Sequence, residues 1–163
     1  MEIERKWLVD KNRCPGLVLY DAEILRTEQG YLNSVDDDWL IRVRKVNKLG
    51  TNKKLLEAGQ DVIYFLLELK TQGLLSREEL RYYITEPNYK ETLSKCESIV
   101  KKTRYCWNED GVYYEVDIYD DHDFVTCEVE FKTEQEANNF KAPDWCIKDV
   151  TYDTAYKNVN LGK

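Results

Sequence analysis

Apolar and polar residues alternate along most of this chain with a period of two, which is typical of β-strands rather than helices. The alternating segments are rich in aromatic and β-branched residues, and tyrosine alone occurs 12 times. Groups of turn-forming residues separate them and predict turns at 33–36, 72–73, 108–111 and 120–123. The strands predicted from this pattern cover residues 1–9, 22–33, 38–47, 61–71, 75–86, 98–108, 111–120 and 123–133.

Two short helices are predicted outside the strands. One covers residues 88–96, and the other covers 133–140, where Thr133 followed by Glu136 forms a capping box. Residues 48–60 are predicted to form a long hairpin excursion with a helical turn. Residues 147–163 are expected to be irregular, with one helical turn near Tyr156.

Eight antiparallel strands in a chain of 163 residues are best accommodated by a barrel, because closure removes exposed strand edges. The length is that of one domain. The predicted fold is therefore mainly β (α+β by element count): a single domain over 1–163 forming a closed eight-stranded antiparallel β-barrel tunnel with short peripheral helices. Side chains of alternate residues would then point into or out of the barrel.

Charged residues recur at every second position within these strands, so that they share one face of each strand. The first strand has Glu2, Glu4 and Lys6 on one face, opposite Ile3, Arg5 and Trp7. The same spacing on the other strands gives Arg42 and Arg44; Glu68 and Lys70; Arg77, Glu79 and Arg81; Lys102 and Arg104; Glu115 and Asp117; and Glu128 and Glu130.

For one strand taken alone, the ordinary interpretation is a sheet with its charged face toward water. Across the whole set, three features favour a charged barrel interior instead. The opposite faces carry large apolar groups that need covering, and Arg is preferred over Lys in several pairs, as expected for gripping phosphate oxygens. The signs also segregate, with basic pairs in 38–47 and 98–108 and acidic pairs in 111–120 and 123–133.

Such an interior requires an occupant, because buried like charges repel unless opposite charge or water compensates them. A linear triphosphate would neutralise the basic wall. Mg²⁺ or Mn²⁺, which prefer hard oxygen ligands, would neutralise the acidic wall.

Composition excludes several other classes of protein. The formal net charge of −7 argues against nucleic-acid binding through surface charge. The longest apolar run, 62–67, is far too short to span a membrane, and no secretion signal is seen, so a cytoplasmic location is expected. The five cysteines lack paired spacing and indicate reduced thiols rather than a zinc site or disulfides, and His122 lies in a predicted turn.

The N-terminal residues Glu2-Ile3-Glu4-Arg5-Lys6 resemble the Glu-x-Glu-x-Lys signature of the CYTH superfamily, the triphosphate tunnel metalloenzymes. The resemblance covers almost the whole chain and is greatest to the small bacterial-type inorganic triphosphatases. Further blocks follow in the family's order: Gln29-Gly30-Tyr31-Leu32, Ile41-Arg42-Val43-Arg44, Leu69-Lys70, Ser76-Arg77-Glu78-Glu79, Lys102-Thr103-Arg104-Tyr105, Glu115-Val116-Asp117, Glu128-Val129-Glu130-Phe131 and Tyr156-Lys157-Asn158.

The resemblance implies a role for each of these positions. Phosphate binding falls to Lys6, Arg42, Arg44, Lys70, Arg77, Lys102, Arg104 and Lys157. Glu2 and Glu4 would bind one divalent ion, with Asp117, Glu128 and Glu130 binding that ion or a second one. Catalytic roles are implied for Lys6, Glu79, Glu115 and Tyr31, although Tyr31 would serve equally well as a packing residue.

Two positions depart from the family pattern. Glu68 stands where many relatives have a neutral hydroxyl residue, and Arg81 stands where a Glu is common. The alternation puts both on the interior side of neighbouring strands. The hypothesis is that they form a compensating pair that narrows one mouth of the tunnel.

The implied reaction is metal-dependent hydrolysis of tripolyphosphate to pyrophosphate and phosphate, which needs no Ser, Cys or His nucleophile. The alternatives on the same fold are a thiamine- or nucleoside-triphosphatase and an adenylate cyclase of class IV type. A non-catalytic module that binds polyphosphate or nucleotides is the alternative from another class. The expected partner is a small molecule containing a triphosphate, without nucleic acid or membrane, and the protein is expected to be a monomer or a homodimer.

Overall fold

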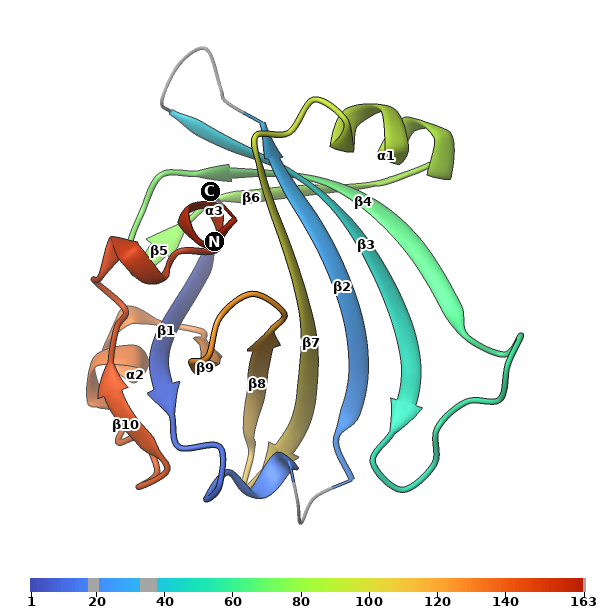
Figure 1. The fold of residues 1–163 in the computed structure, drawn as a ribbon. Helices are drawn as coiled ribbons and strands as arrows, with labels where there is room; N and C mark the ends of the chain where they lie inside the picture. The colour runs from blue at the N-terminus through green and yellow to red at the C-terminus, as the bar shows by residue number, and fades with distance from the viewer. Residues whose placement is uncertain (18–20, 33–37, 163) are drawn as a thin grey trace.

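The computed structural model describes residues 1–17, 21–32 and 38–162. Within them, ten strands form one antiparallel sheet that curls into a nearly closed barrel (Figure 1). The strands follow one another in the order β10-β1-β9-β8-β7-β2-β3-β4-β6, and β5 pairs with β1. Their bounds are β1 Glu2–Val9, β2 Glu23–Leu32, β3 Trp39–Thr51, β4 Val62–Thr71, β5 Ser76–Arg77, β6 Glu79–Ile84, β7 Ser98–Glu109, β8 Val112–Tyr119, β9 Val125–Phe131 and β10 Cys146–Asp149.

Strand β1 is where the two ends of the sheet meet. One edge of β1 pairs with β9, while its other edge pairs with β5 at Glu2 and Ile3 and with β10 from Trp7 to Val9. Since β5 leads directly into β6, the partner of β4, this two-residue strand closes the barrel at the start of β1. The backbone N–H of Glu4 reinforces the closure by donating to the carbonyl of Leu75 at 3.0 Å.

The predicted antiparallel barrel is confirmed, and its strand count needs a small correction. The eight predicted strands correspond to β1, β2, β3, β4, β6, β7, β8 and β9. The strand predicted over 75–86 is in fact two strands. After β4 the chain first pairs with β1 as β5, and then returns to pair with β4 as β6. The short β10 lies in the C-terminal part that was expected to be irregular. The predicted turn at 33–36 lies outside the described residues.

The helices are short. They are α1 Glu86–Leu93, α2 Glu134–Asn139, α3 Asn158–Leu161 and the 3₁₀ helices η1 Pro15–Leu17 and η2 Thr154–Tyr156. Helices α1 and α2 lie outside the barrel wall, whereas η2 and α3 border an interior cavity at one mouth of the barrel. The predicted N-cap of α2 is confirmed, because the Thr133 side chain accepts from the N–H of Glu136 at 3.1 Å; the Glu136 carboxylate accepts in return from the N–H of Lys132, one residue before the cap. None of the helices among the described residues is long and apolar enough to cross a lipid bilayer.

The excursion between β3 and β4 is present, but the helical turn predicted within 48–60 is wrong. Instead, β3 continues to Thr51, four residues beyond its predicted end. Gly50, at a φ of 108°, pairs with Leu55 and turns the chain back. A left-handed backbone at this position favours glycine, because other residues meet a steric penalty there.

The main hydrophobic core lies outside the barrel rather than inside it. It forms between the outward faces of β1, β7, β8 and β9 and the covering residues 140–146 and α2. Three rings pack together at its centre, with the Trp145 ring centroid 5.8 Å from that of Trp107 and 5.3 Å from that of Tyr114. The apolar half of the alternation therefore faces outward, and the polar half is left to line the interior.

Arg5 fastens this covering layer to β1. Its guanidinium donates to the carbonyls of Ala137 and Phe140, at 2.8 and 3.0 Å, and pairs with Asp149 at 2.6 Å. We expect Arg5→Ala to lower the free energy of unfolding by about 2–3 kcal/mol, since these bonds involve a charged donor. Urea denaturation would measure this, with the exposed Lys11→Ala as control; equal stability of the two variants would contradict the assignment.

Candidate active site

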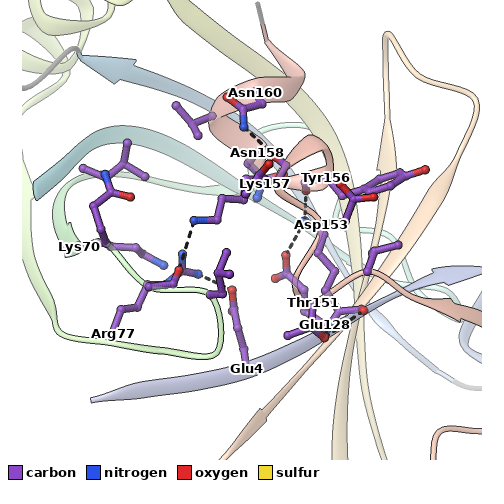
Figure 2. Close-up of a pocket in the computed structure, with 18 of the residues that line it drawn as sticks. Glu4, Lys70, Arg77, Glu128, Thr151, Asp153, Tyr156, Lys157, Asn158 and Asn160 are labelled. Carbon is purple, nitrogen blue, oxygen red and sulfur yellow. Dashed lines mark hydrogen bonds and ion pairs between the residues drawn. The ribbon is translucent and has the colours of Figure 1, made fainter. Parts of the chain in front are cut away.

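Two neighbouring cavities occupy the barrel interior. The first cavity, of about 360 Å³, is bordered by residues 71–74 and by the C-terminal residues 150–160 (Figure 2). The second cavity, of about 280 Å³, extends toward Tyr64 and Tyr113. Six residues line both, so the two form one continuous charged space: Glu4, Arg42, Lys70, Arg77, Glu128 and Asn158.

The structure brings nearly all predicted site residues to this space. Besides the shared residues, the first cavity is lined by Lys6, Tyr31 and Lys157. The second is lined by Glu2, Arg44, Glu79, Arg104, Glu115 and Glu130. Lys102 and Asp117 line neither cavity, because they are buried against each other in the wall.

One charged group lies where β1, β4 and β5 meet. Lys70 and Arg77 contact the Glu2 carboxylate at 3.1 and 3.0 Å, and Arg77 also bonds to Glu4. Burial raises the pKa of Glu4 to about 7, with Glu128 and Glu2 adding repulsion that Arg77 does not overcome. A cation bound beside Glu4 would therefore favour its charged form.

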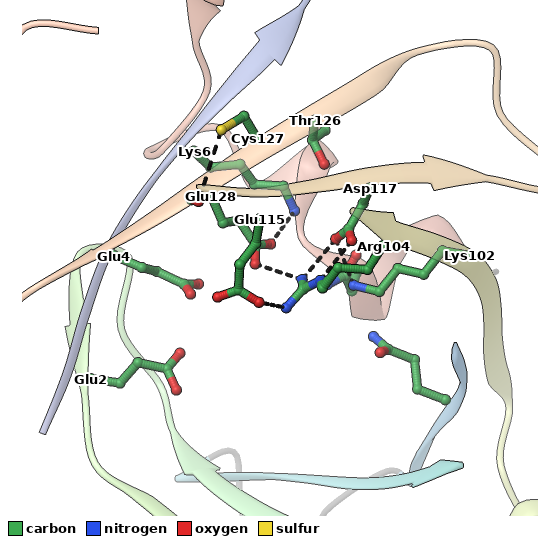
Figure 3. Close-up of polar contacts among 12 residues, drawn as sticks. Glu2, Glu4, Lys6, Lys102, Arg104, Glu115, Asp117, Thr126, Cys127 and Glu128 are labelled. Atoms are coloured by element: carbon green, nitrogen blue, oxygen red, sulfur yellow. Dashed lines mark hydrogen bonds and ion pairs between the residues drawn. The ribbon is translucent and has the colours of Figure 1, made fainter. Parts of the chain in front are cut away.

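A second group is centred on Arg104 of β7 (Figure 3). Its guanidinium contacts Asp117 at 2.7 Å and Glu128 at 2.9 Å, and it also bonds to Glu115. Lys102 lies 2.7 Å from the same Asp117 carboxylate, and both side chains are inaccessible to solvent. Burial and the neighbouring Arg104 lower the pKa of Lys102 to about 8.

Lys6 links β1 to the C-terminal segment. Its Nζ lies 3.3 Å from Glu128 and donates to the carbonyl of Tyr156 at 2.8 Å. Burial lowers the pKa of Lys6, but nearby acidic groups, including Glu128, outweigh that effect and raise it. Lys157 similarly donates to the carbonyl of Gly73, at 3.3 Å.

A third group occupies β3, β4 and β6. Arg42 and Arg44 converge on the buried carboxylate of Glu68, with Arg44 at 2.8 Å. The expected contact between Glu68 and Arg81 is present at 3.6 Å. Glu68 is inaccessible to solvent and lines neither cavity, so it lies behind the arginines rather than at a mouth.

Some side chains beside the cavities were not singled out from the sequence. Thr151 accepts from the backbone N–H of Lys6 at 3.0 Å, and Asn158 lines both cavities. Asn158 belongs to the quoted Tyr-Lys-Asn block and could have been found there. Thr151 follows β10, which no pattern predicted. Tyr31 pairs in register with Arg42, and its hydroxyl accepts from Gln29 at 2.6 Å, so it both packs and faces the first cavity.

The remaining sequence candidates lie elsewhere. His122 does not line either cavity; its Nε2 lies 2.7 Å from the carbonyl of Leu161, and its ring stacks on Phe124. All five cysteines are free, as expected.

The model of the CYTH domain matches residues 1–154 of the chain. The protein belongs to the CYTH family. It is 32% identical to an inorganic triphosphatase of Nitrosomonas europaea, over 98% of this chain and 95% of that one. It is also 32% identical to an inorganic triphosphatase of Acetivibrio thermocellus, over 99% and 93% of the two chains.

Solved structures agree with this assignment. The crystal structure of the inorganic triphosphatase NE1496 is similar to this CYTH protein with a TM-score of 0.64 and 28% identity, covering 99% of this chain and 94% of that one. A protein of Pyrococcus horikoshii, PH1012, shares the fold at a TM-score of 0.58 and 23% identity, covering 85% and 84%.

The carboxylates of this CYTH domain suit a hard divalent cation. Glu2, Glu4, Glu128 and Glu130 line the second cavity and offer only oxygen donors, as Mg²⁺ and Mn²⁺ prefer. Burial, together with Glu2 and Glu115, raises the pKa of Glu130, and burial also raises that of Glu4, so a bound cation would favour the charged form of both. Among the described residues, no three acidic, His or Cys side chains already form a metal cluster.

Asp117 is the main counter-charge of the barrel wall. Asp117→Asn leaves Lys102 and Arg104 buried beside a neutral group, and we expect a loss of about 3–5 kcal/mol in the free energy of unfolding at pH 7. Arg104 and Lys102 overcome the effect of burial and lower the pKa of Asp117. The stabilisation is therefore present above the unfolded-state pKa of about 4 and is lost as the pH falls below it.

Denaturant unfolding at pH 7 and at pH 3 would measure both effects. The outward-facing Asp120→Asn, which removes an exposed partner of Arg26, is the matched control and should change stability little. A large loss in the Asp120 variant, or none in the Asp117 variant, would contradict this account of the wall.

Proposed function

We propose that this CYTH protein is a divalent-metal-dependent triphosphatase that hydrolyses inorganic tripolyphosphate to pyrophosphate and phosphate. The observation that carries the proposal is the set of cationic side chains from six strands and the C-terminal segment that line one continuous interior space. Its dimensions and charge suit a short polyanion. The names of the two relatives, both inorganic triphosphatases, support this choice among the activities on the fold.

Binding would proceed by exchange of partners. Lys6, Lys70 and Arg77 line the first cavity and now contact carboxylates or backbone carbonyls. Phosphate oxygens can replace those acceptors at little cost in desolvation, because the cations are already removed from bulk water. Arg42, Arg44 and Arg104 present planar forks that suit bidentate contact with phosphate.

The carboxylates would divide between metal binding and proton transfer. Glu2, Glu4, Glu128 and Glu130 would hold Mg²⁺ or Mn²⁺, which supplies charge neutralisation on phosphate oxygens when bound. Glu79 is the candidate to accept a proton from the attacking water, because burial and hydrogen bonds to Glu2 and Glu68 raise its pKa to about 7. Glu115 orients Arg104, and Asp117 would support both cations from the wall.

Positioning and charge neutralisation supply most of the catalysis in phosphoryl transfer, so no covalent nucleophile is required. Tyr31 lies beside Arg42 on the neighbouring strand and faces the first cavity, where its hydroxyl would contact a terminal phosphate. The free thiols are those expected of a protein in a reducing compartment, and a cytoplasmic location is part of the proposal.

The same space also supports a second candidate. Leu40, Leu74 and Val159 give the first cavity an apolar side, which would accommodate an organic group joined to the triphosphate. Thiamine triphosphate and nucleoside triphosphates are the substrates of this kind.

The proposal predicts chelator-sensitive release of phosphate from tripolyphosphate in the presence of Mg²⁺ or Mn²⁺. We expect turnover of tripolyphosphate to exceed that of ATP and thiamine triphosphate at least tenfold, because the basic residues surround the cavity. Phosphate release from the purified protein would measure this for the three substrates. Preferential cleavage of either organic substrate would favour the second candidate, and binding without cleavage would indicate a non-catalytic module.

Replacement of single interior charges should remove activity without unfolding the protein. We expect Lys6→Ala and Glu4→Gln each to lower kcat/KM for tripolyphosphate by about 100-fold or more, as for other positioned electrostatic groups. Lys101→Ala changes an exposed lysine on the outward side of β7 and is the matched control. A folded Glu4→Gln enzyme with normal activity would remove Glu4 from the metal site.

A further inference from the structure

Glu68 is a completely buried carboxylate in the middle of β4 that contacts three arginines. It bonds to Arg42 and lies 2.8 Å from Arg44, both on the adjacent strand β3. Arg81 of β6, on the other side, lies 3.6 Å away. Glu68 lines neither cavity, whereas Arg42 and Arg44 both line the second one. It therefore touches the arginines from behind, where a bound phosphate would not reach it.

Arg42 and Arg44 occupy alternate positions on one strand, so both guanidinium groups point to the same side. Their terminal nitrogens contact the same carboxylate, while the buried Nε atoms of both have no hydrogen-bond partner among the described residues. Such donors are costly to leave unpaired. An anion in the second cavity would contact the terminal nitrogens of Arg42 and Arg44, because the Nε atoms themselves are buried.

Two carboxylates face three arginines at this place. Arg81 pairs with Glu79 at 3.3 Å, and Glu79 also hydrogen-bonds to Glu68. Glu68 and Glu79 leave one of the three positive charges uncompensated, which favours a polyanion. Without Glu68, Arg42 and Arg44 would be repelling cations free to move apart.

We propose that Glu68 is a positioning residue for substrate binding, acting through Arg42 and Arg44, whose guanidinium groups it orients together toward the phosphates. This inference rests on the proposed triphosphatase function and adds to it a residue that touches no substrate.

The arrangement gives a kinetic signature that a purely structural role lacks. An arginine keeps its proton throughout the working pH range, so loss of the Glu68 charge would change the orientation of Arg42 and Arg44 and not their charge. Binding of the phosphates should therefore weaken, while turnover of bound substrate changes less.

The test compares Glu68→Gln with the unchanged protein at pH 7. We expect KM for tripolyphosphate to rise about tenfold, equivalent to about 1.4 kcal/mol, with a smaller change in kcat. Glu78→Gln, at an exposed neighbouring position, is the control and should match the unchanged protein. An unchanged KM, or a loss confined to kcat, would overturn the proposal.

A double-mutant cycle tests whether Glu68 acts through Arg44. In an Arg44→Gln background the effect of Glu68→Gln on KM should shrink at least threefold, whereas an effect of the same size in both backgrounds would overturn the proposal. This pair also covers the case in which Glu68→Gln alone does not fold, because the double variant removes one charge of each sign.

Binding of tripolyphosphate without metal, measured by calorimetry on the same variants, reports the effect independently of turnover.

These results separate the two proposals. If the unchanged protein does not cleave tripolyphosphate, the proposed function is overturned. Weaker binding of tripolyphosphate by the Glu68→Gln variant would establish the positioning role even in that case. Normal cleavage and binding by Glu68→Gln would overturn only the positioning role.

Discussion

The structure depends on mutual neutralisation of charges that the barrel removes from water. An isolated charge in such an interior would shift its pKa and lose its charge, so every cation needs an anion within contact distance. Arg42 pairs with Glu68 and Arg104 with Asp117 between adjacent strands, whereas Lys70 of β4 reaches Glu2 of β1 across the closure of the barrel. An acidic chain can consequently bind an anion, because what matters is the local charge that remains after pairing and not the net charge of −7.

This constraint explains why the hydrophobic core lies outside the barrel. The strand alternation leaves only one face for apolar side chains, and the charged face is already committed to the interior. The outward face of β1, with Trp7, then needs α2 and residues 140–146 as a cover. Arg5 belongs to the outward set, although it lies between two interior residues of the signature. One short segment thus specifies both the site and the attachment of the covering layer.

The sequence predicted the faces of the strands better than their closure. A period of two identifies the interior residues, so nearly all the predicted site residues line the cavities. It does not report depth, and for this reason Lys102 and Asp117 could not be distinguished in advance from residues that face the open space. The two-residue β5 is too short to have a period, and β10 carries no alternation that differs from a loop. Both depend on contacts with β1 that arise only once the barrel is formed.

The contacts with cations divide the interior carboxylates into two physical classes. In the first class, hydrogen bonds and nearby cations outweigh the effect of burial and lower the pKa values; its members are Glu68 and Asp117 in the wall and Glu2 and Glu128 at the second cavity. Glu4 and Glu130 also line the second cavity, but burial and neighbouring carboxylates raise their pKa values. The first class is bound firmly to the cations and fixes their geometry. The second is costly to ionise within the protein alone, so a divalent ion bound beside it would favour its charged form. A site that must bind a polyanion and its metal together requires both classes, because the cations must stay in place while the exposed carboxylates change partners.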